Sequence, residues 1–332
     1  MNTRLILTLT ATLASAFAQT PPKPKRPGIK AVQVPFSSLH PSATFKLGGH
    51  PDWLAITPDA VWVANDQLKA VQRINPRTNR VVAKIDFPAE PCSGLAVGFG
   101  SLWVPLCGEP ATLARVDLKT NLITATLPFG PADSEGGITA SRDSIWLVTG
   151  KDGTLSRIDP ETNTVRQKIS IPPGSANPLF SDGFIWITNS TETPVPIAMV
   201  NAMTGQMESV FSAGSHPRFL TAGAGAIWAL NQGDGSISKI ETIRDMRAIT
   251  SIAAGIPGTG GEICFDGKSV WATVFDIPLT RIDAKTNRVV RQWVGEGGDS
   301  VRFGHGSLWL THYKKGLLWR IPLSQTRIRR AQ

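Results

Sequence analysis

The sequence is poor in charge, in tyrosine and in long apolar segments. Only 18% of its 332 residues are Asp, Glu, Lys or Arg, and one Tyr stands against ten Trp. Beyond the N-terminal region no stretch of about 18 apolar residues occurs, so that part of the sequence predicts no transmembrane helix. Low charge together with 31 Gly and 25 Pro is typical of an all-β protein with many short strands and tight turns.

Common catalytic and metal-binding motifs are also missing. The sequence contains no G-x-S-x-G, no HExxH, no EF-hand loop, and no signature of a PQQ or haem site. The segment from Gly261 to Ser269 resembles a phosphate-binding loop, but five residues separate its glycines where that motif has four. It is also expected on a β-hairpin and not at the start of a helix. The internal repeat is therefore the main guide to this sequence.

A tryptophan motif recurs seven times, with 38 to 43 residues between successive copies. GSLWV at 100–104 and GSLWL at 306–310 are two examples. The repeated residues are Trp62, Trp103, Trp146, Trp186, Trp228, Trp271 and Trp309. A second motif, which reads RIN, RVD or RID in most copies, follows each Trp by 10 to 13 residues. Two motifs that keep step over a period near 40 residues mark a single large repeat domain.

One copy, residues 92–129, shows what each repeat forms. Strands are expected at 93–97, 102–106, 112–116 and 123–127. Turn sequences separate them, including DLKTN, in which Asp can bond to the backbone ahead and Asn tolerates the left-handed conformation. Four antiparallel strands in each period predict an all-β, seven-bladed β-propeller.

The seventh repeat lacks its outer strand, because only LSQTRIRRAQ follows Pro322. Segment 42–47 matches the outer strand that ends near Asp86, so it is expected to complete blade seven and close the ring. A basic residue recurs in six copies and is therefore expected to serve the blade and not a unique site. It stands at positions 73, 115, 157, 239, 281 and 320.

The regions that flank the repeats have their own compositions. Residues 1–18 read as a cleavable signal peptide, with Arg4, an apolar run and an A-x-A site, which predicts a periplasmic or secreted protein. Residues 19–41 are rich in Pro and Lys and are interpreted as an extended tether. The propeller is expected over 42–323, followed by a basic tail at 324–332.

The repeat resembles the YVTN-type (YncE-like) propeller repeat, on the evidence of WVAND at 62–66, WITNS at 186–190 and the DPETN turn. It is similar, more loosely, to the propeller of virginiamycin B (streptogramin) lyase. That second resemblance implies a Glu-x-His pair on an inner strand, a further Glu after a neighbouring Trp, and bound magnesium. Here Cys264 stands where the His would follow Glu262, and no Glu lies three residues after any repeated Trp. Both departures argue against the elimination chemistry.

The three cysteines divide into a pair and a single residue. If the first hairpin of blade two turns between Phe99 and Gly100, antiparallel pairing places Cys92 opposite Cys107. In an exported protein this predicts a disulfide, which would stabilise the fold by ~3 kcal/mol. Cys264 falls within an inner strand and is expected to be a buried free thiol.

Candidate site residues come from the loops that meet at one mouth of the central channel. Polar residues that interrupt the repeat there are His50, Asp52, Glu135, Arg218, Glu262, Asp299 and His312. Histidines and carboxylates from several blades suit a polar ligand, or a divalent metal such as Mg or Ca if the protein is catalytic.

Two functions remain open. The first is a non-catalytic, monomeric propeller that binds a small molecule or another protein. The alternative is a metal-dependent lyase, similar to virginiamycin B lyase, or a hydrolase with its site at the channel mouth. Nucleic acid is not expected as a partner: the formal charge is +9, but no aromatic stripe alternates with Lys and Arg.

Overall fold

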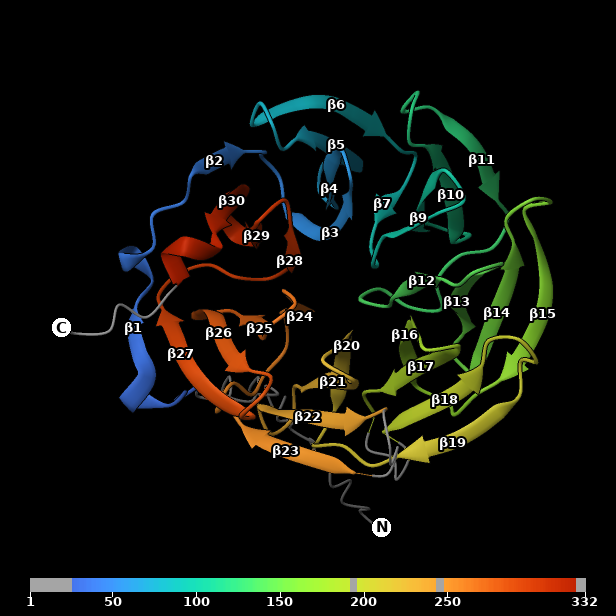
Figure 1. Ribbon diagram of the computed structural model, residues 1–332. Coiled ribbons are helices and arrows are strands. Elements are labelled where there is room, and N and C mark those ends of the chain that lie inside the picture. Colours follow the sequence, from blue (N-terminus) through green and yellow to red (C-terminus); the bar gives the residue numbers. More distant parts are fainter. Residues whose placement is uncertain (1–25, 192–195, 243–247, 327–332) are drawn as a thin grey trace, which may run out of the picture.

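Seven β-sheets surround a central channel in the computed structural model, which describes residues 26–191, 196–242 and 248–326 (Figure 1). The predicted all-β, seven-bladed propeller is confirmed. Each sheet runs from an inner strand at the channel to an outer strand at the rim. Among the described residues, no helix is long and apolar enough to cross a membrane.

The first four blades follow one another along the chain. Blade one contains β3 (Pro51–Thr57), β4 (Ala60–Asn65), β5 (Ala70–Asn75) and β6 (Arg80–Asp86). Blade two contains β7 (Glu90–Pro91), β8 (Ala96–Gly98), β9 (Ser101–Cys107), β10 (Thr112–Asp117) and β11 (Ile123–Leu127). Blade three contains β12 (Ile138–Ala140), β13 (Ile145–Gly150), β14 (Thr154–Asp159) and β15 (Thr164–Ser170). Blade four contains β16 (Ser175–Ser181), β17 (Phe184–Asn189), β18 (Ile197–Asn201) and β19 (Met207–Phe211).

The last three blades include both N-terminal strands. Blade five contains β20 (Pro217–Gly223), β21 (Ala226–Asn231), β22 (Ser236–Glu241) and β23 (Ile249–Ala253). Blade six contains β24 (Glu262–Phe265), β25 (Ser269–Val274), β26 (Ile277–Asp283), β27 (Arg288–Val294) and the additional β1 (Gln33–Pro35). Blade seven contains β28 (Val301–Gly304), β29 (Ser307–His312), β30 (Leu317–Pro322) and β2 (Ala43–Lys46). Short 3-10 helices are η1 (Lys30–Val32), η2 (Phe36–Ser38), η3 (Tyr313–Lys315) and η4 (Leu323–Thr326).

The repeated Trp residues join neighbouring blades. All seven are fully buried on the second strand of their blade. Trp103 packs against Ile145 and Leu147 of blade three, and Trp309 packs against Val61 and Val63 of blade one. Since a blade cannot bury both of its faces alone, this packing explains why the motif recurs once in every repeat.

Four of the repeated basic residues bond to the next blade, namely Arg73, Arg115, Arg157 and Arg320. Lys239 instead pairs with Glu241 in its own strand. The Arg115 guanidinium lies 4.8 Å from the centre of the Trp103 ring and donates a 2.9 Å hydrogen bond to Asn163 in the turn of blade three. Arg320 of blade seven makes the same bond, at 2.8 Å, to Asn79 of blade one. The expectation that these residues are structural is confirmed, and Arg320 adds a side-chain bond across the closure of the ring.

The predicted closure is also confirmed. β2 pairs antiparallel with β30, with Phe45 opposite Leu318. One element was not foreseen: β1 pairs in parallel with β27 as a fifth, outermost strand of blade six. Residues 26–38, which the sequence analysis assigned to the tether, therefore lie against the propeller. The predicted signal peptide, residues 19–25 and residues 327–332 lie outside the described part of the chain.

The predicted disulfide between Cys92 and Cys107 is present, with the two Cα atoms 5.7 Å apart. The expected register is wrong at this point, because Glu90 and not Cys92 lies opposite Cys107. Residues 92–95 interrupt the inner strand between β7 and β8, and the disulfide spans that interruption. Cys264 is a buried free thiol, as expected.

Candidate functional site

Two carboxyl groups meet at the channel from opposite ends of the chain. Asp52 lies near the start of β3, and Asp299 lies just before β28 in the adjacent blade. Each is only 9% exposed. The Gly261 backbone N–H donates to Asp299 Oδ1 at 3.3 Å, and the Ser300 hydroxyl donates to Asp52 Oδ1 at 3.5 Å. Among the described residues, neither carboxyl has an ion-pair partner.

Burial raises the pKa of both aspartates. The pKa of Asp299 rises to about 7, chiefly through burial and then through the nearby charge of Glu135. The pKa of Asp52 rises well above its usual value through burial, with further contributions from Asp299, Glu135 and Glu262. The two carboxyl groups lie close enough that each affects the pKa of the other. Near neutral pH the pair therefore retains at least one proton.

Glu262 is neutralised by an arginine from the next blade. It begins β24, is 2% exposed, and forms an ion pair with Arg302 on β28. The Val301 backbone N–H also donates to Glu262 Oε2 at 3.1 Å. Burial raises the pKa of Glu262, and the Arg302 charge opposes that effect. This carboxylate is already satisfied, so it is less available to a ligand than Asp299.

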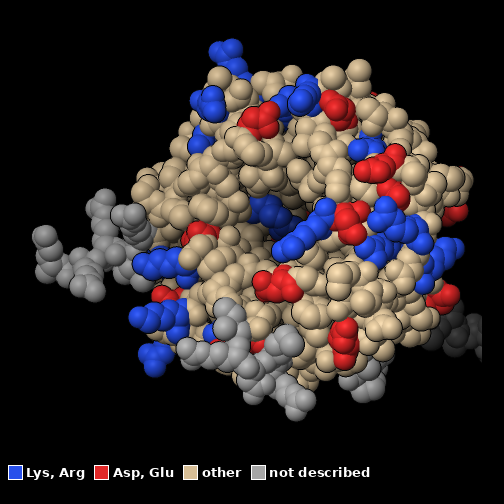
Figure 2. Space-filling model, turned by 45° about the vertical axis from the view of Figure 1, so that its right-hand side comes forward, with Lys and Arg blue, Asp and Glu red and all other residues tan. Residues whose placement is uncertain are grey.

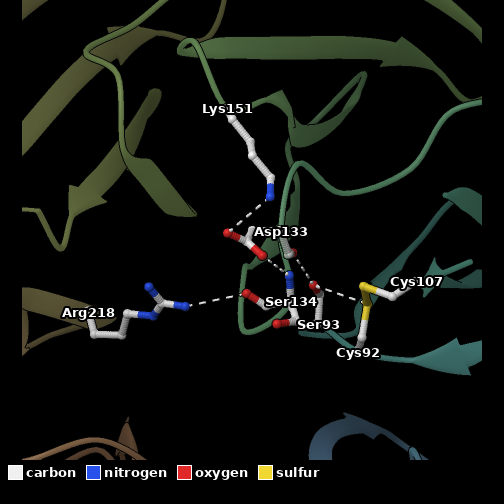
Figure 3. The surroundings of a disulfide bond; sticks show 7 residues. All are labelled: Cys92, Ser93, Cys107, Asp133, Ser134, Lys151 and Arg218. Carbon is white, nitrogen blue, oxygen red and sulfur yellow. Dashed lines mark hydrogen bonds and ion pairs between the residues drawn. A yellow bond between two sulfur atoms is a disulfide. The ribbon is translucent and has the colours of Figure 1, made fainter. Parts of the chain in front are cut away.

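Arg218 reaches from blade five to the loop that precedes blade three. Its Nη2 donates at 3.4 Å to the backbone carbonyl of Ser134 (Figure 3). Nη2 also donates at 2.9 Å to the carbonyl of Glu135, and Nη1 donates at 2.8 Å to the Ser190 hydroxyl. The loop is also fixed from blade two, because the Glu135 backbone N–H donates to the Cys92 carbonyl at 2.8 Å. The disulfide and Arg218 thus hold opposite sides of one loop.

Glu135 stands at the turn of this loop, with a positive φ of 60°. Burial raises the pKa of its carboxyl, and the nearby Arg218 charge partly offsets that rise. Burial in turn lowers the pKa of Arg218. Because the guanidinium bonds to backbone carbonyls, the Glu135 carboxylate has no ion-pair partner among the residues described.

A third group joins blades seven and one. Tyr313, which begins η3, donates its hydroxyl to Asp66 Oδ2 at 2.7 Å. His50 lies with Nδ1 3.3 Å from Asp66 Oδ1 and stacks on Tyr313 with ring centres 4.5 Å apart. Burial and the bond to Asp66 raise the pKa of Tyr313, which stays a neutral donor. Asp66 and Tyr313 were not among the selected residues, although each directly follows the second strand of its blade.

These groups surround a cavity of about 400 Å³ at the mouth. Its lining residues are Glu135, Arg218, Gln232, Thr259, Gly260, Phe275, Asp299 and Tyr313. A second cavity, of about 270 Å³, lies along the inner strands and is bordered by Trp53, Phe219, Glu262 and Arg302. Trp53 and Phe219 meet edge to face, 5.7 Å apart, from blades on different sides of the channel. Figure 2 shows the hollow at the centre of the molecule, with charged side chains at its edge.

His312 does not join this site. It ends β29 on the side that faces blade six, where its ring lies 5.4 Å from that of Trp319. Burial lowers its pKa, and nearby Lys315 lowers it further. The structure therefore brings together Asp52, Glu135, Arg218 and Asp299. Glu262 lies beside them in its ion pair, and His50 reaches the cavity through Tyr313.

The mouth does not have the ligand set of a metal centre. In the described ranges, no three His, Cys, Asp or Glu side chains are grouped so that they could hold a metal ion. Asp52 and Asp299 supply only two carboxyl groups, which retain at least one proton near neutral pH. The residues present therefore do not fit the magnesium that the lyase resemblance implies.

Comparisons with known proteins show the fold alone. No protein-family model matches the sequence, and no curated protein matches it. Virginiamycin B lyase from Staphylococcus aureus is similar in structure, with a TM-score of 0.70, 16% identity, and coverage of 84% of this chain and 98% of the lyase. A catalytically inactive variant of that lyase with quinupristin gives a TM-score of 0.71 at 17% identity, over 86% of this chain and 98% of the variant. BamB from Moraxella catarrhalis is similar with a TM-score of 0.60 and 10% identity, over 85% of this chain and 99% of BamB.

Proposed function

We propose that this protein is an exported, non-catalytic binding propeller of the YVTN (YncE-like) type. In this proposal the channel mouth takes a small ligand through a cationic group such as an amine or a guanidine. The observation that carries it is the buried pair of Asp52 and Asp299, which lies beside a cavity of about 400 Å³ and whose carboxyl pKa values are both raised.

The charges at the mouth favour a cation. Asp52, Asp299 and Glu135 have no ion-pair partner among the described residues, whereas Glu262 is neutralised by Arg302. Arg218 is the guanidinium that lines the mouth cavity, and both of its Nη atoms donate to carbonyl or hydroxyl oxygens of the protein. A ligand cation can replace a proton that the aspartates retain. It would gain charge-assisted hydrogen bonds to these carboxyl groups.

The walls of the cavity suit the rest of such a ligand. Phe275 and Tyr313 offer aromatic rings, which attract cations and apolar groups alike. Gln232 and the Gly260 backbone add neutral hydrogen-bonding groups. A concave site with a few converging polar groups and perturbed carboxyl pKa values is typical of small-molecule binding.

A matched ligand series tests this proposal. Benzylamine, benzyl alcohol and benzoate differ mainly in the charge of one group, so we expect only the amine to raise the melting temperature. Asp299→Asn should lose that effect, whereas Asp86→Asn, on the exposed outer strand of blade one, should keep it. Equal responses to amine and alcohol, or an amine response that survives in Asp299→Asn, would refute the assignment.

A lyase is the second candidate. Two observations favour it: the structural similarity to virginiamycin B lyase, and a carboxyl pKa of about 7, which suits a general base at neutral pH. Cys264 does not help, because burial holds its pKa far above the usual range and its side chain packs between blades six and seven. Conversion of quinupristin, followed by liquid chromatography, would support this candidate if Asp299→Asn abolished it.

A further inference from the structure

We propose that the channel beyond the mouth is a second binding site, which takes a neutral aromatic molecule with one carbonyl group. The site is the cavity of about 270 Å³ along the inner strands. It shares no lining residue with the mouth cavity, so this inference does not depend on the proposed cation site. A protein cavity of ~150 Å³ is enough to bind benzene, so this one has room for about two fused rings.

The cavity exists because the inner strands differ at one level of the channel. Two residues before the residue that pairs with the repeated Trp, blades one and five carry Trp53 and Phe219, whose rings meet edge to face. At the same position blades two and three carry Gly94 and Gly137. Apart from its own chain neighbours, no atom would lie closer than 3.5 Å to a Cβ on Gly94. The aromatic rings therefore form one wall, and the two glycines leave space beside them.

One ion pair borders this cavity. Glu262 and Arg302 are the charged residues among those that line it, and they neutralise each other. The Glu262 side chain is 2% exposed, whereas that of Arg302 is 31% exposed. Arg302 also donates from Nη1 to the Val301 carbonyl at 3.0 Å, so two of its five N–H groups have partners in the described part of the chain. The accessible polar group is thus an N–H donor whose charge is already balanced.

Such a donor suits a neutral acceptor. A carboxylate would bring a second negative charge beside buried Glu262, and an ammonium group would meet the Arg302 guanidinium, whereas a carbonyl oxygen avoids both repulsions. Trp53 supplies another donor, since it is 3% exposed and its Nε1 has no hydrogen-bond partner among the described residues. An indole N–H can only donate, so it also favours a ligand with an acceptor. Leu179 and Leu220 add apolar surface for the rings.

1-Tetralone and tetralin test this site, because both have two fused rings and only the ketone has an acceptor. We expect 1-tetralone to bind about tenfold more tightly than tetralin, as measured by the rise in melting temperature across a titration, since a hydrogen bond to Arg302 is charge-assisted. Gly94→Val should weaken 1-tetralone, because its side chain would enter the cavity. Ser209→Val, on the exposed outer strand β19, is the control and should bind 1-tetralone as the unaltered protein does. Glu262→Gln with Arg302→Met removes the ion pair without leaving a lone buried charge, and it should bind the two ligands equally.

The outcomes separate this site from the proposed function. Equal affinities for ketone and hydrocarbon, or no binding of either, overturn the channel site. A Gly94→Val variant that melts cooperatively and binds 1-tetralone unchanged also overturns it, as does a double variant that still prefers the ketone. Loss of 1-tetralone in Asp299→Asn would place the ketone at the mouth and would have the same consequence. If 1-tetralone binds Asp299→Asn as it binds the unaltered protein while benzylamine binds neither, the channel site stands and the proposed function does not.

Discussion

Asp299→Asn should stabilise the protein at alkaline pH, although it replaces a residue of the proposed binding site. Raising a carboxyl pKa from 3.8 in the unfolded chain to about 7 in the fold costs about 4 kcal/mol once the group must ionise. Asparagine carries no charge, so the variant avoids this cost. Its amide oxygen can still accept the bond from the Gly261 backbone N–H.

The sign of the pH dependence follows from proton binding. Between pH 3.8 and about 7 the folded state holds a proton on Asp299 that the unfolded chain has released. The stability of the unaltered protein therefore falls as pH rises through this window, and it stays at the lower value above it. We expect the variant to gain about 4 kcal/mol at pH 8 and well under 1 kcal/mol at pH 4.

Scanning calorimetry at the two pH values measures this difference. For about 300 ordered residues, 4 kcal/mol corresponds to a rise in Tm of about 6 °C. Asp86→Asn is the control, and its Tm should change little and equally at both pH values. A variant that melts no higher than the unaltered protein at pH 8 would show that Asp299 is not held above its usual pKa. Equal shifts at pH 4 and pH 8 would show that the effect is not one of ionisation.

Three further changes test the parts around this pair. Reducing the disulfide between Cys92 and Cys107 should lower Tm and weaken the binding of benzylamine, because the Cys92 carbonyl accepts a hydrogen bond from the Glu135 loop. An unchanged affinity for benzylamine in calorimetry would exclude that role. Arg320→Ala should lower Tm by more than Lys84→Ala, since Arg320 bonds to Asn79 across the ring closure and Lys84 pairs with Asp86 on an outer strand. Equal decreases in Tm would show that the Arg320 bond does not stabilise the ring closure. His312→Ala should change the affinity for benzylamine by less than twofold, because the His312 ring faces Trp319. A large loss of affinity would show that His312 belongs to the binding site.

The repeat made the fold predictable from the sequence. Each blade buries its Trp against the next, so the motif and its spacing record contacts that every blade must make. The missing outer strand of blade seven pointed directly to 42–47. The repeat could not predict β1, because β1 is an additional strand that pairs in parallel with the outer edge of blade six and has no counterpart in the repeated pattern. The interruption at residues 92–95 also has no counterpart in the period, and it shifted the register beside Cys107.

The candidate site was predictable only in part. Loop position identified Asp52, Glu135, Arg218 and Asp299, because inner strands of a propeller all begin at one mouth. Their interactions depend on ring closure and on the direction of each side chain, which the spacing does not give. His312 lies apart from the other selected residues, since it stands two residues beyond Leu310 and so shares its orientation toward blade six. Asp66 was missed because its role depends on Tyr313, from the far end of the chain.

The most direct test of the central claim is a carbon-detected NMR titration of the aspartate carboxyl groups, with and without benzylamine. We expect one carboxyl, absent in Asp299→Asn, to titrate with an apparent pKa of about 7. Saturating amine should lower that pKa, because the cation takes the place of the retained proton. If every aspartate titrates near its usual value, or if the raised pKa is the same with and without the amine, the mouth is not the cation site proposed here.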